Sequence, residues 1–252
     1  MLRFPRRKSN SSGRSIEAGG KEAVMKESNF NISNESIIRN AIQEQIMNNE
    51  LKPGDTLSSE NVLADEFGMK RIVVRNALVQ LEKMGLLNSR QGVGRFVKEK
   101  RPVIELDMSG RRSFSDKMRE QGVDYESKLI FAGYATKREQ EKYRQALTVG
   151  DDVSIFKVAR LRIVDHMPCA IHISYVREDM VPDINEEAEQ LASMFNYYGR
   201  HGYTNLKSMD THIHTAFPTL EEQRHLECGE LVPLILKYID YWKGRMTCLN
   251  RI

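Results

Sequence analysis

The sequence has few of the residues that hold together disulfide-rich, metal-stapled or membrane-spanning proteins. Its three cysteines, Cys169, Cys228 and Cys248, are odd in number and far apart. This spacing argues against a disulfide framework or a CxxC zinc site and favours reduced thiols. No apolar run approaches the ~20 residues of a membrane helix, and the basic N-terminus lacks the apolar stretch of a secretory signal. We therefore expect a cytoplasmic protein without membrane association.

A strong excess of charge is also absent. The 252 residues carry a formal net charge of only +3, which does not by itself indicate nucleic acid. The distribution is uneven, because residues 70–98 contain seven Lys or Arg side chains and one acidic side chain, Glu82. Such a run is commonly just a solvated face. Here it coincides with the DNA-binding pattern described next, and we interpret it as a footprint for phosphates.

Residues 1–32 are rich in Ser, Asn, Gly and charge, with little apolar periodicity. We expect a disordered extension, with Met25 as an alternative start of the chain. Residues 33–49 then predict a first helix, capped by Ser33 or Asn34. Pro53 and Gly54 end it, because neither residue favours a continuing helix.

Residues 57–97 have the pattern of two helices joined by a tight turn and followed by a short ribbon. Ser58 or Ser59 can cap the first of these helices, and Gly68 supplies the turn that ends it. The next helix is predicted over residues 70–84. Its buried face comprises Val74, Ala77, Leu78 and Leu81.

The outward side of the 70–84 helix is polar and basic near its start, where it presents Lys70, Arg71, Arg75 and Asn76. A helix-turn-helix presents its recognition helix to the major groove in this way. Short strands at 86–88 and 95–97 flank a glycine-bearing tip at 90–94, which forms a wing. Residues 33–98 therefore predict a winged helix-turn-helix that binds double-stranded DNA.

This stretch resembles the DNA-binding domain of GntR-superfamily transcription regulators. The shared segments are residues 50–55, Leu57-Ser58-Ser59-Glu60, the Arg-x-x-Val-Arg spacing from Arg71 to Arg75, and Gly92-Val93-Gly94-Arg95-Phe96. Family members usually have a basic residue at Asn61 and hydroxyl residues at Lys70, Ile72 and Val73. The resemblance implies DNA contacts from Ser59, Glu60, Lys70, Arg71, Val73, Arg75, Asn76, Gly92, Gly94 and Arg95.

Each implied contact has a physical role. Arg71 and Arg75 suit bidentate hydrogen bonding to guanine, worth roughly 1–3 kcal/mol of discrimination per good pair. Lys70 and Ser59 would hold phosphates and set the register. Gly92 and Gly94 would let the wing backbone approach the minor groove, with Arg95 beside it. Any one of these alone could be an ordinary surface residue.

Residues 99–112 are expected to form a linker, because Pro102 interrupts regular structure. Residues 113–252 predict alternating helices and strands, and therefore an α+β domain with an antiparallel sheet. We expect helices at 113–122, 138–147, 186–196 and 220–228. Strands are expected at 127–135, 153–164, 169–176, 205–215 and 232–242, with a turn at 166–168.

This order is similar to the UTRA effector domain of the HutC branch of those regulators, a fold shared with chorismate lyase. Its markers are Phe114-Ser115, Gly150-Asp151-Asp152-Val153, Arg160-Leu161-Arg162 and Pro168. Relatives bind small, often phosphorylated metabolites there. The resemblance implies effector binding by Ser113, Phe114, Arg160, Arg162, His172 and Cys248. The last two stand where sugar-phosphate-binding relatives carry Glu, and the chain ends before the family's closing segment.

The two arginines illustrate the chemistry. Their period-2 spacing puts Arg160 and Arg162 on one face of a strand, where guanidinium groups can hold phosphate or carboxylate by forked hydrogen bonds. Ser113 would add a hydroxyl at a helix start that favours anions. The alternative is a pair of exposed arginines at a sheet edge.

Three other interpretations stay open. His212 and His214, with Asp210, could bind metal at alternating strand positions, although a polar strand face is the interpretation we favour. Residues 113–252 could carry a chorismate-lyase-like activity, although the sequence has no obvious acid–base pair. Finally, the domain could be an inert dimerisation module of an architectural DNA binder.

The sequence as a whole predicts a transcription regulator rather than an enzyme. We expect a repressor that binds palindromic operator DNA as a homodimer, with no cofactor. A phosphorylated sugar or an organic acid would act as effector by favouring one arrangement of the dimer.

Overall fold

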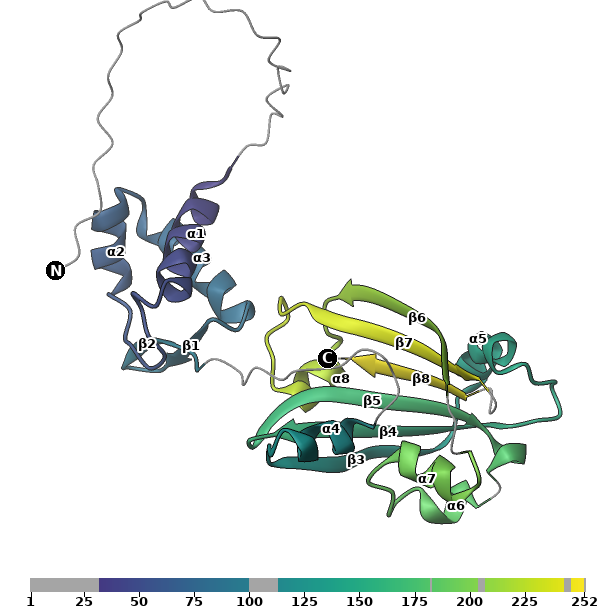
Figure 1. Cartoon of the computed structure of the whole chain (residues 1–252). Coiled ribbons are helices and arrows are strands. Elements are labelled where there is room, and N and C mark those ends of the chain that lie inside the picture. The colour runs from purple at the N-terminus through teal and green to yellow at the C-terminus, as the bar shows by residue number, and fades with distance from the viewer. Residues whose placement is uncertain (1–31, 100–112, 182, 204–206, 243–245, 252) are drawn as a thin grey trace, which may run out of the picture. The chain divides into compact units, whose positions relative to one another are not determined.

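The computed structural model describes residues 32–99, 113–181, 183–203, 207–242 and 246–251. The chain folds into two compact units whose main division lies between Lys98 and Glu99 (Figure 1). The predicted extension at 1–32 and linker at 99–112 fall almost entirely outside the described residues. No helix in the described part is long and apolar enough to cross a lipid bilayer.

The first unit contains helices α1 (Asn34–Met47), α2 (Glu60–Phe67) and α3 (Arg71–Lys83), followed by strands β1 (Leu87–Arg90) and β2 (Gly94–Val97). Ser33 caps α1 and Ser59 caps α2, each accepting a backbone N–H three residues on. Gly68 ends α2 in the left-handed conformation, at φ 63°. The three helices share one apolar core with the wing, comprising Ile38, Ile42, Ile46, Leu57, Leu63, Val74, Ala77, Leu78, Leu81, Leu87 and Val97.

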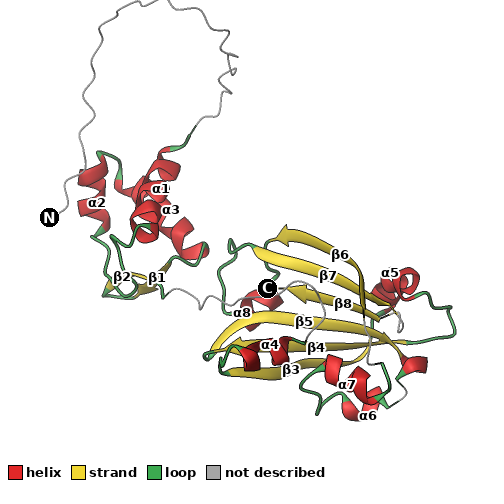
Figure 2. Ribbon diagram, in the orientation of Figure 1, coloured by secondary structure: helices red, strands yellow, loops and turns green. Residues whose placement is uncertain are grey.

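The second unit is built on one six-stranded sheet of order β3-β4-β5-β8-β7-β6, in which all neighbours are antiparallel (Figure 2). Its strands are β3 (Tyr125–Tyr134), β4 (Ile155–Val164), β5 (Met167–Arg177), β6 (Lys207–Ala216), β7 (Leu234–Trp242) and β8 (Met246–Arg251). Its α-helices are α4 (Phe114–Glu120), α5 (Lys137–Leu147), α6 (Ile184–Glu187), α7 (Met194–Arg200) and α8 (Leu220–Leu226).

Helices cover both faces of this sheet. On the face that we call the front, Phe156 and Val158 of β4 pack against α6 and α7, and Val164 packs against α4. On the opposite face, the back, Ile155 of β4 packs against α5 and Leu161 packs against α8. Because side chains alternate along a strand, β4 contributes to both cores. Its two neighbouring arginine positions therefore belong to the front face.

Most predicted elements are present, and three details differ. The helix predicted at 186–196 is wrong, because the chain forms a short α6, then a turn, and then α7, which begins after its cap Ser193. The turn predicted at 166–168 is shorter, because only Asp165 and His166 adopt positive φ and β5 already begins at Met167. Strand β8, between β5 and β7, was not predicted.

Candidate functional site

The start of helix α3 presents the side chains that were predicted to read DNA. Arg71, Arg75 and Asn76 are exposed there, and Lys70 is exposed just before the helix. Val73 is half-buried. The opposite side of α3 is inside the core, which fixes the direction in which the exposed side points. The geometry is that of a recognition helix held by a three-helix scaffold.

One carboxylate connects the recognition helix to the wing. Glu60, the first residue of α2, accepts a hydrogen bond from Arg71 Nε at 2.9 Å and another from Arg95 Nη1 at 3.0 Å. Arg95 Nε also donates to Glu82 of α3 at 2.6 Å. Burial alone would raise the pKa of Glu60, but hydrogen bonds from the two arginines outweigh it and lower the pKa. Glu60 is therefore held as an anion.

Arg95 and Arg71 differ in how much of each side chain is exposed for contact with DNA. The Arg95 side chain is only 18% exposed and is held between two carboxylates, so it ties the wing to α2 and α3. The Arg71 side chain is 64% exposed, with one of its donors on Glu60. The wing glycines Gly92 and Gly94 both have positive φ, which side-chain-bearing residues rarely adopt.

Two apolar residues on this surface were not among the predicted contacts. Ile72 on α3 is 57% exposed, and Val93 at the wing tip is 66% exposed. Apolar side chains at such places can contact thymine methyl groups in the major groove or the sugars of the minor groove. The signal in the sequence was the presence of apolar residues at outward-facing positions of an otherwise polar surface.

The second unit buries the two arginines predicted to bind effector. Arg160 and Arg162 are 5% and 4% exposed, in the second strand of the sheet, so the alternative of an exposed edge pair is wrong. Arg160 donates to the hydroxyl and the carbonyl of Ser127 at 2.8 and 2.9 Å. Arg162 donates to the same hydroxyl and, at 2.9 Å, to the carbonyl of Ala192. The Nη1 of Arg160 is buried and has no hydrogen-bond partner among the described residues.

An aromatic ring of helix α4 and the ring of His172 in β5 lie beside Arg162. The Phe114 ring is 5.5 Å from its guanidinium carbon and meets the His172 ring edge-on at 5.3 Å. Ser113 caps α4 and donates its hydroxyl proton to Asp116 at 2.7 Å, so that proton is already used. The hydroxyl of Ser115 is buried and has no hydrogen-bond partner in the part of the chain that the structure describes. We call Ser115, Arg160, Arg162 and His172, with Phe114, the arginine cluster.

His172 is neutral in this setting. Burial lowers its pKa well below the usual value, and the positive charges of Arg162, Lys117 and Lys237 lower it further. Lys237, which is 4% exposed in β7, was not among the predicted site residues. A lysine inside the apolar run of that strand was the available signal. Cys248 lies opposite Ser174 in the β5–β8 ladder, and its side chain lies outside the described structure.

The histidines considered as metal ligands are on strand β6. His212 and His214 are exposed on alternate positions, and the Asp210 side chain lies outside the described residues. Elsewhere in the described part, ligand atoms of Asp183, Glu187 and His201 lie within 4.8 Å of one another. That Glu187 is already paired with Arg200 at 2.6 Å.

A winged helix-turn-helix joined to an antiparallel α+β domain defines a DNA-binding regulator with a separate ligand-binding domain. Comparison with known proteins agrees with this class. Residues 35–97 match the family of bacterial regulatory proteins called gntR, and residues 120–238 match the UTRA domain. The chain is 30% identical to the transcriptional repressor NagR of Bacillus subtilis over 199 residues, which covers 79% of this chain and 80% of NagR.

A second relative is the Escherichia coli mannosyl-D-glycerate transport/metabolism system repressor MngR, 29% identical over 79% of this chain and 81% of that protein. Among solved structures, a GntR-family transcriptional regulator aligns with TM-score 0.51 at 16% identity, over 86% of this chain and 92% of that chain. PhnF from Mycobacterium smegmatis aligns with TM-score 0.49 at 20% identity, over 85% and 94%.

The chain belongs to the GntR family and has the UTRA-domain architecture of its HutC branch. It is an effector-regulated, DNA-binding transcriptional repressor. Its relatives are transcription regulators and not enzymes, so the chorismate-lyase-like alternative is not supported.

The Glu60 bridge gives a first prediction. Glu60→Gln removes an anion that positions Arg71 and Arg95, and it also adds net positive charge next to DNA. We expect the ratio of operator to random-DNA affinity to fall roughly tenfold, measured by fluorescence anisotropy with a selected operator and a scrambled duplex. Glu66→Gln on the same helix makes the same charge change at an exposed position and should keep the ratio.

The Glu60 carboxylate makes the stability of the first unit depend on pH in a defined direction. The pKa of Glu60 is lower in the folded state than the reference value of 4.5, so the carboxylate stabilises the first unit above that value. This contribution disappears as the pH falls through the folded pKa. Hydrogen exchange of residues 34–97 between about pH 6 and pH 3 should therefore show a steeper loss of protection in the wild type than in Glu60→Gln. Equal slopes would contradict the bridge.

Proposed function

We propose that this repressor reads a palindromic operator as a homodimer and responds to a small organic anion bound at the arginine cluster. Arg71 and Arg75 would contact bases in the major groove. Lys70, Ser59 and Asn76 would contact phosphates, and the wing at Gly92 and Gly94 would enter the minor groove. In this proposal Glu60 and Arg95 act mainly by positioning.

A single observation carries the effector proposal. Arg160 is a buried cation with no carboxylate paired to it in the described structure, and one of its donors has no partner. A buried charge without a counter-ion is costly, by several kcal/mol in proteins. A phosphate or carboxylate would satisfy this donor and supply the missing charge. MngR is named for mannosyl-D-glycerate, a sugar derivative that carries a carboxylate.

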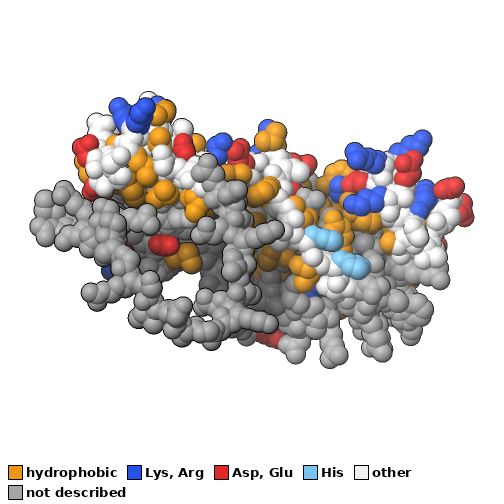
Figure 3. Space-filling view, turned by 90° about the horizontal axis from the view of Figure 1, so that it is seen from above, with side chains coloured by type: hydrophobic (Ala, Val, Ile, Leu, Met, Phe, Trp, Pro, Cys, Tyr) orange, Lys and Arg blue, Asp and Glu red, His pale blue; other side chains and the backbone are white. Residues whose placement is uncertain are grey.

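The dimer proposal is supported by apolar side chains that no element of the described structure covers. Strand β6 is an edge of the sheet, and helices α4, α6 and α7 pack on the opposite half of the front face. On the uncovered half, Ile213 and Ile235 are 55% and 45% exposed, and Phe217 after β6 is 63% exposed. Figure 3 shows hydrophobic side chains exposed among charged ones on the face that it views. A second copy would bury this patch.

The proposed mechanism is linkage. Two winged helices fit a palindrome only at a fixed separation. An effector that binds one arrangement of the dimer more tightly shifts the population toward it, by as much as the difference between its two affinities. The shift changes operator affinity without any contact between effector and DNA.

The recognition-helix assignment predicts a loss of sequence discrimination. We expect Arg71→Ala and Arg75→Ala each to lose about 1–3 kcal/mol of preference for the operator, while effector binding to the second unit stays the same. Gel-shift competition between operator and random DNA measures the preference. Arg39→Ala on α1 removes a cation outside this surface and serves as the control. Retained preference in both variants would refute the assignment.

If the arginine cluster is the effector site, a variant of it should lose effector binding and keep DNA binding. Arg160→Ala should bind operator like the wild type but lose release by phosphorylated sugars and sugar acids. A thermal-shift screen of these compounds, followed by gel shift, tests both parts. Arg119→Ala, which removes an exposed cation of α4, is the matched control. Release of Arg160→Ala at wild-type effector concentrations would exclude the cluster. An absence of any responding compound would place the effector outside the class of phosphorylated sugars and sugar acids.

If this apolar surface is the dimer interface, a charge placed in it should lower the mass of the assembly. Ile213→Asp would place a charge in a buried apolar interface, so we expect a shift toward monomer in sedimentation velocity and weaker operator binding. Val62→Asp makes the same replacement at a 46% exposed site on α2 and should leave the mass of the assembly unchanged. A dimeric Ile213→Asp would place the interface elsewhere.

A further inference from the structure

The back face of the sheet contains a cavity that is separate from the arginine cluster. It has a volume of about 430 Å³ and lies between helices α5 and α8, over strands β3, β4 and β5. Lys157 and Ala159 of β4 line it, whereas Arg160 and Arg162 of the same strand belong to the front face. The sheet itself therefore stands between the two places. Cavities of this size accept small organic molecules.

The floor of this cavity is apolar and aromatic. Ile171 and Ile173 of β5 lie beside Ala159. Tyr175 of β5 stacks on Tyr143 of α5, with ring centroids 4.0 Å apart and planes 26° apart. Aromatic rings and branched aliphatic side chains favour the apolar body of a ligand over water.

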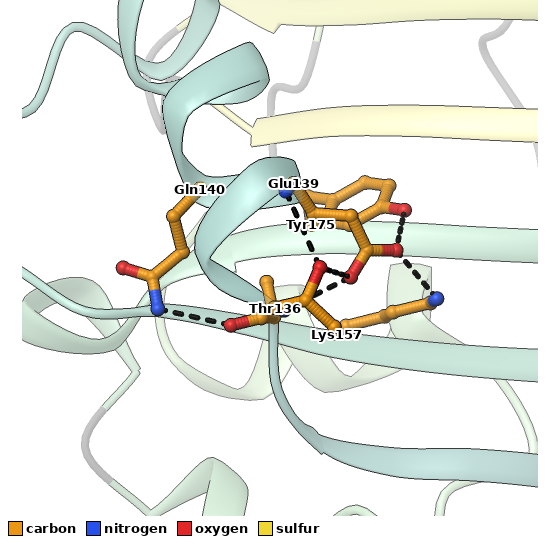
Figure 4. A network of polar contacts seen from close by, with 6 residues as sticks. Thr136, Glu139, Gln140, Lys157 and Tyr175 are labelled. Carbon is orange, nitrogen blue, oxygen red and sulfur yellow. Dashed lines mark hydrogen bonds and ion pairs between the residues drawn. The ribbon is translucent and has the colours of Figure 1, made fainter.

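One group of polar side chains in the cavity, centred on Glu139, is internally hydrogen-bonded (Figure 4). Glu139 of α5 accepts hydrogen bonds from Lys157 at 2.6 Å and from the Tyr175 hydroxyl at 2.8 Å. It also accepts from the hydroxyl and backbone N–H of Thr136. Burial opposes ionisation of Glu139, but these donors outweigh it and lower its pKa to about 2. The charge of Lys157 is therefore neutralised within the cavity.

Two other cations line the cavity without such a partner. Arg138 and Lys142 of α5 are exposed and four residues apart, so they project from the same side of the helix. In the described structure neither of them has a carboxylate within ion-pair distance. Lys142 lies over the rings of Tyr143 and Tyr238, 5.1 and 5.8 Å from their centroids. The cavity thus combines an apolar floor with positive charge along its α5 side, whereas Glu221 and Glu222 line its α8 side.

We propose that this cavity is a second ligand site, which takes a small organic acid with an aromatic or branched apolar body. The body lies on Ile171, Ile173 and the tyrosine pair, and its carboxylate faces Arg138 and Lys142. The site differs from the arginine cluster in chemistry, because it favours an apolar acid over a polar phosphorylated one. It is independent of the effector proposed above.

The test uses three probes that share a naphthalene ring and differ in charge: 2-naphthoate, 2-naphthalenemethanol and 2-naphthylmethylammonium. Isothermal titration of the full-length protein should show saturable binding of the carboxylate, weaker binding of the alcohol and no binding of the ammonium ion. The Arg138→Ala/Lys142→Ala double variant should bind 2-naphthoate at least tenfold more weakly. Lys137→Ala removes a neighbouring exposed cation that does not line the cavity, and should bind like the wild type.

Two further variants make each outcome decisive. Ala159→Leu fills the cavity and should lose the carboxylate and the alcohol alike, with an unchanged melting profile by circular dichroism. Arg160→Ala should keep 2-naphthoate binding, because it alters the other face. The proposal is overturned if the wild type does not bind 2-naphthoate, if the double variant binds it equally well, or if Arg160→Ala abolishes the binding. Failure here leaves the effector proposal at the arginine cluster standing.

Discussion

The burial of guanidinium groups within the sheet is the constraint that organises the second unit. Two cations occupy the front face at 5% and 4% exposure, where they would be costly if they had no acceptors. The hydroxyl of Ser127 and the carbonyl of Ala192 meet part of this demand. Helix α4 covers the same region and adds a second unsatisfied group, Ser115. The fold thus keeps polar groups that its own residues do not fully satisfy, as expected of a binding site.

The first unit uses paired charge differently. Glu60 lies where the start of α2, the start of α3 and the wing meet, and it holds a cation from each of the latter two. The recognition helix and the wing are thereby fixed relative to one another before DNA arrives. Preorganisation of this kind reduces the ordering cost of binding. One acidic residue within a basic surface is then a structural requirement and not a defect in charge complementarity.

The fold was largely predictable because its signals were local. Ser33, Ser59 and Gly68 mark helix ends through caps and turns, and the 3.6-residue periodicity of α3 separates its buried and exposed sides. The division of 186–196 was missed because Ser193 was not recognised as the cap of a separate helix, and its neighbour Ala192 is held by Arg162 through a contact across 30 residues. Strand β8 lacks an alternating apolar pattern.

The candidate site was predictable only in part, for a related reason. Arg160 and Arg162 could be placed on one face of a strand, but their burial depends on α4 and on Ser127. Lys237 and the back-face cavity depend on how separate elements pack, which periodicity does not reveal. The partnering of Arg95 with Glu60 and Glu82 likewise required the wing to be folded back against two helices.

The hydroxyl of Ser127 connects ligand binding at the arginine cluster to the chain between α6 and α7. Its oxygen accepts from both arginines while its proton is donated to Ala192, at 3.0 Å, so its full bonding capacity is used and its orientation is locked. An anion that draws a guanidinium toward itself withdraws one of these bonds and lets the hydroxyl rotate. The connection between α6 and α7 would then lose its hydrogen bond from Ser127 to the Ala192 carbonyl. Ligand binding at the arginines would in this way change the position of the front-face helices.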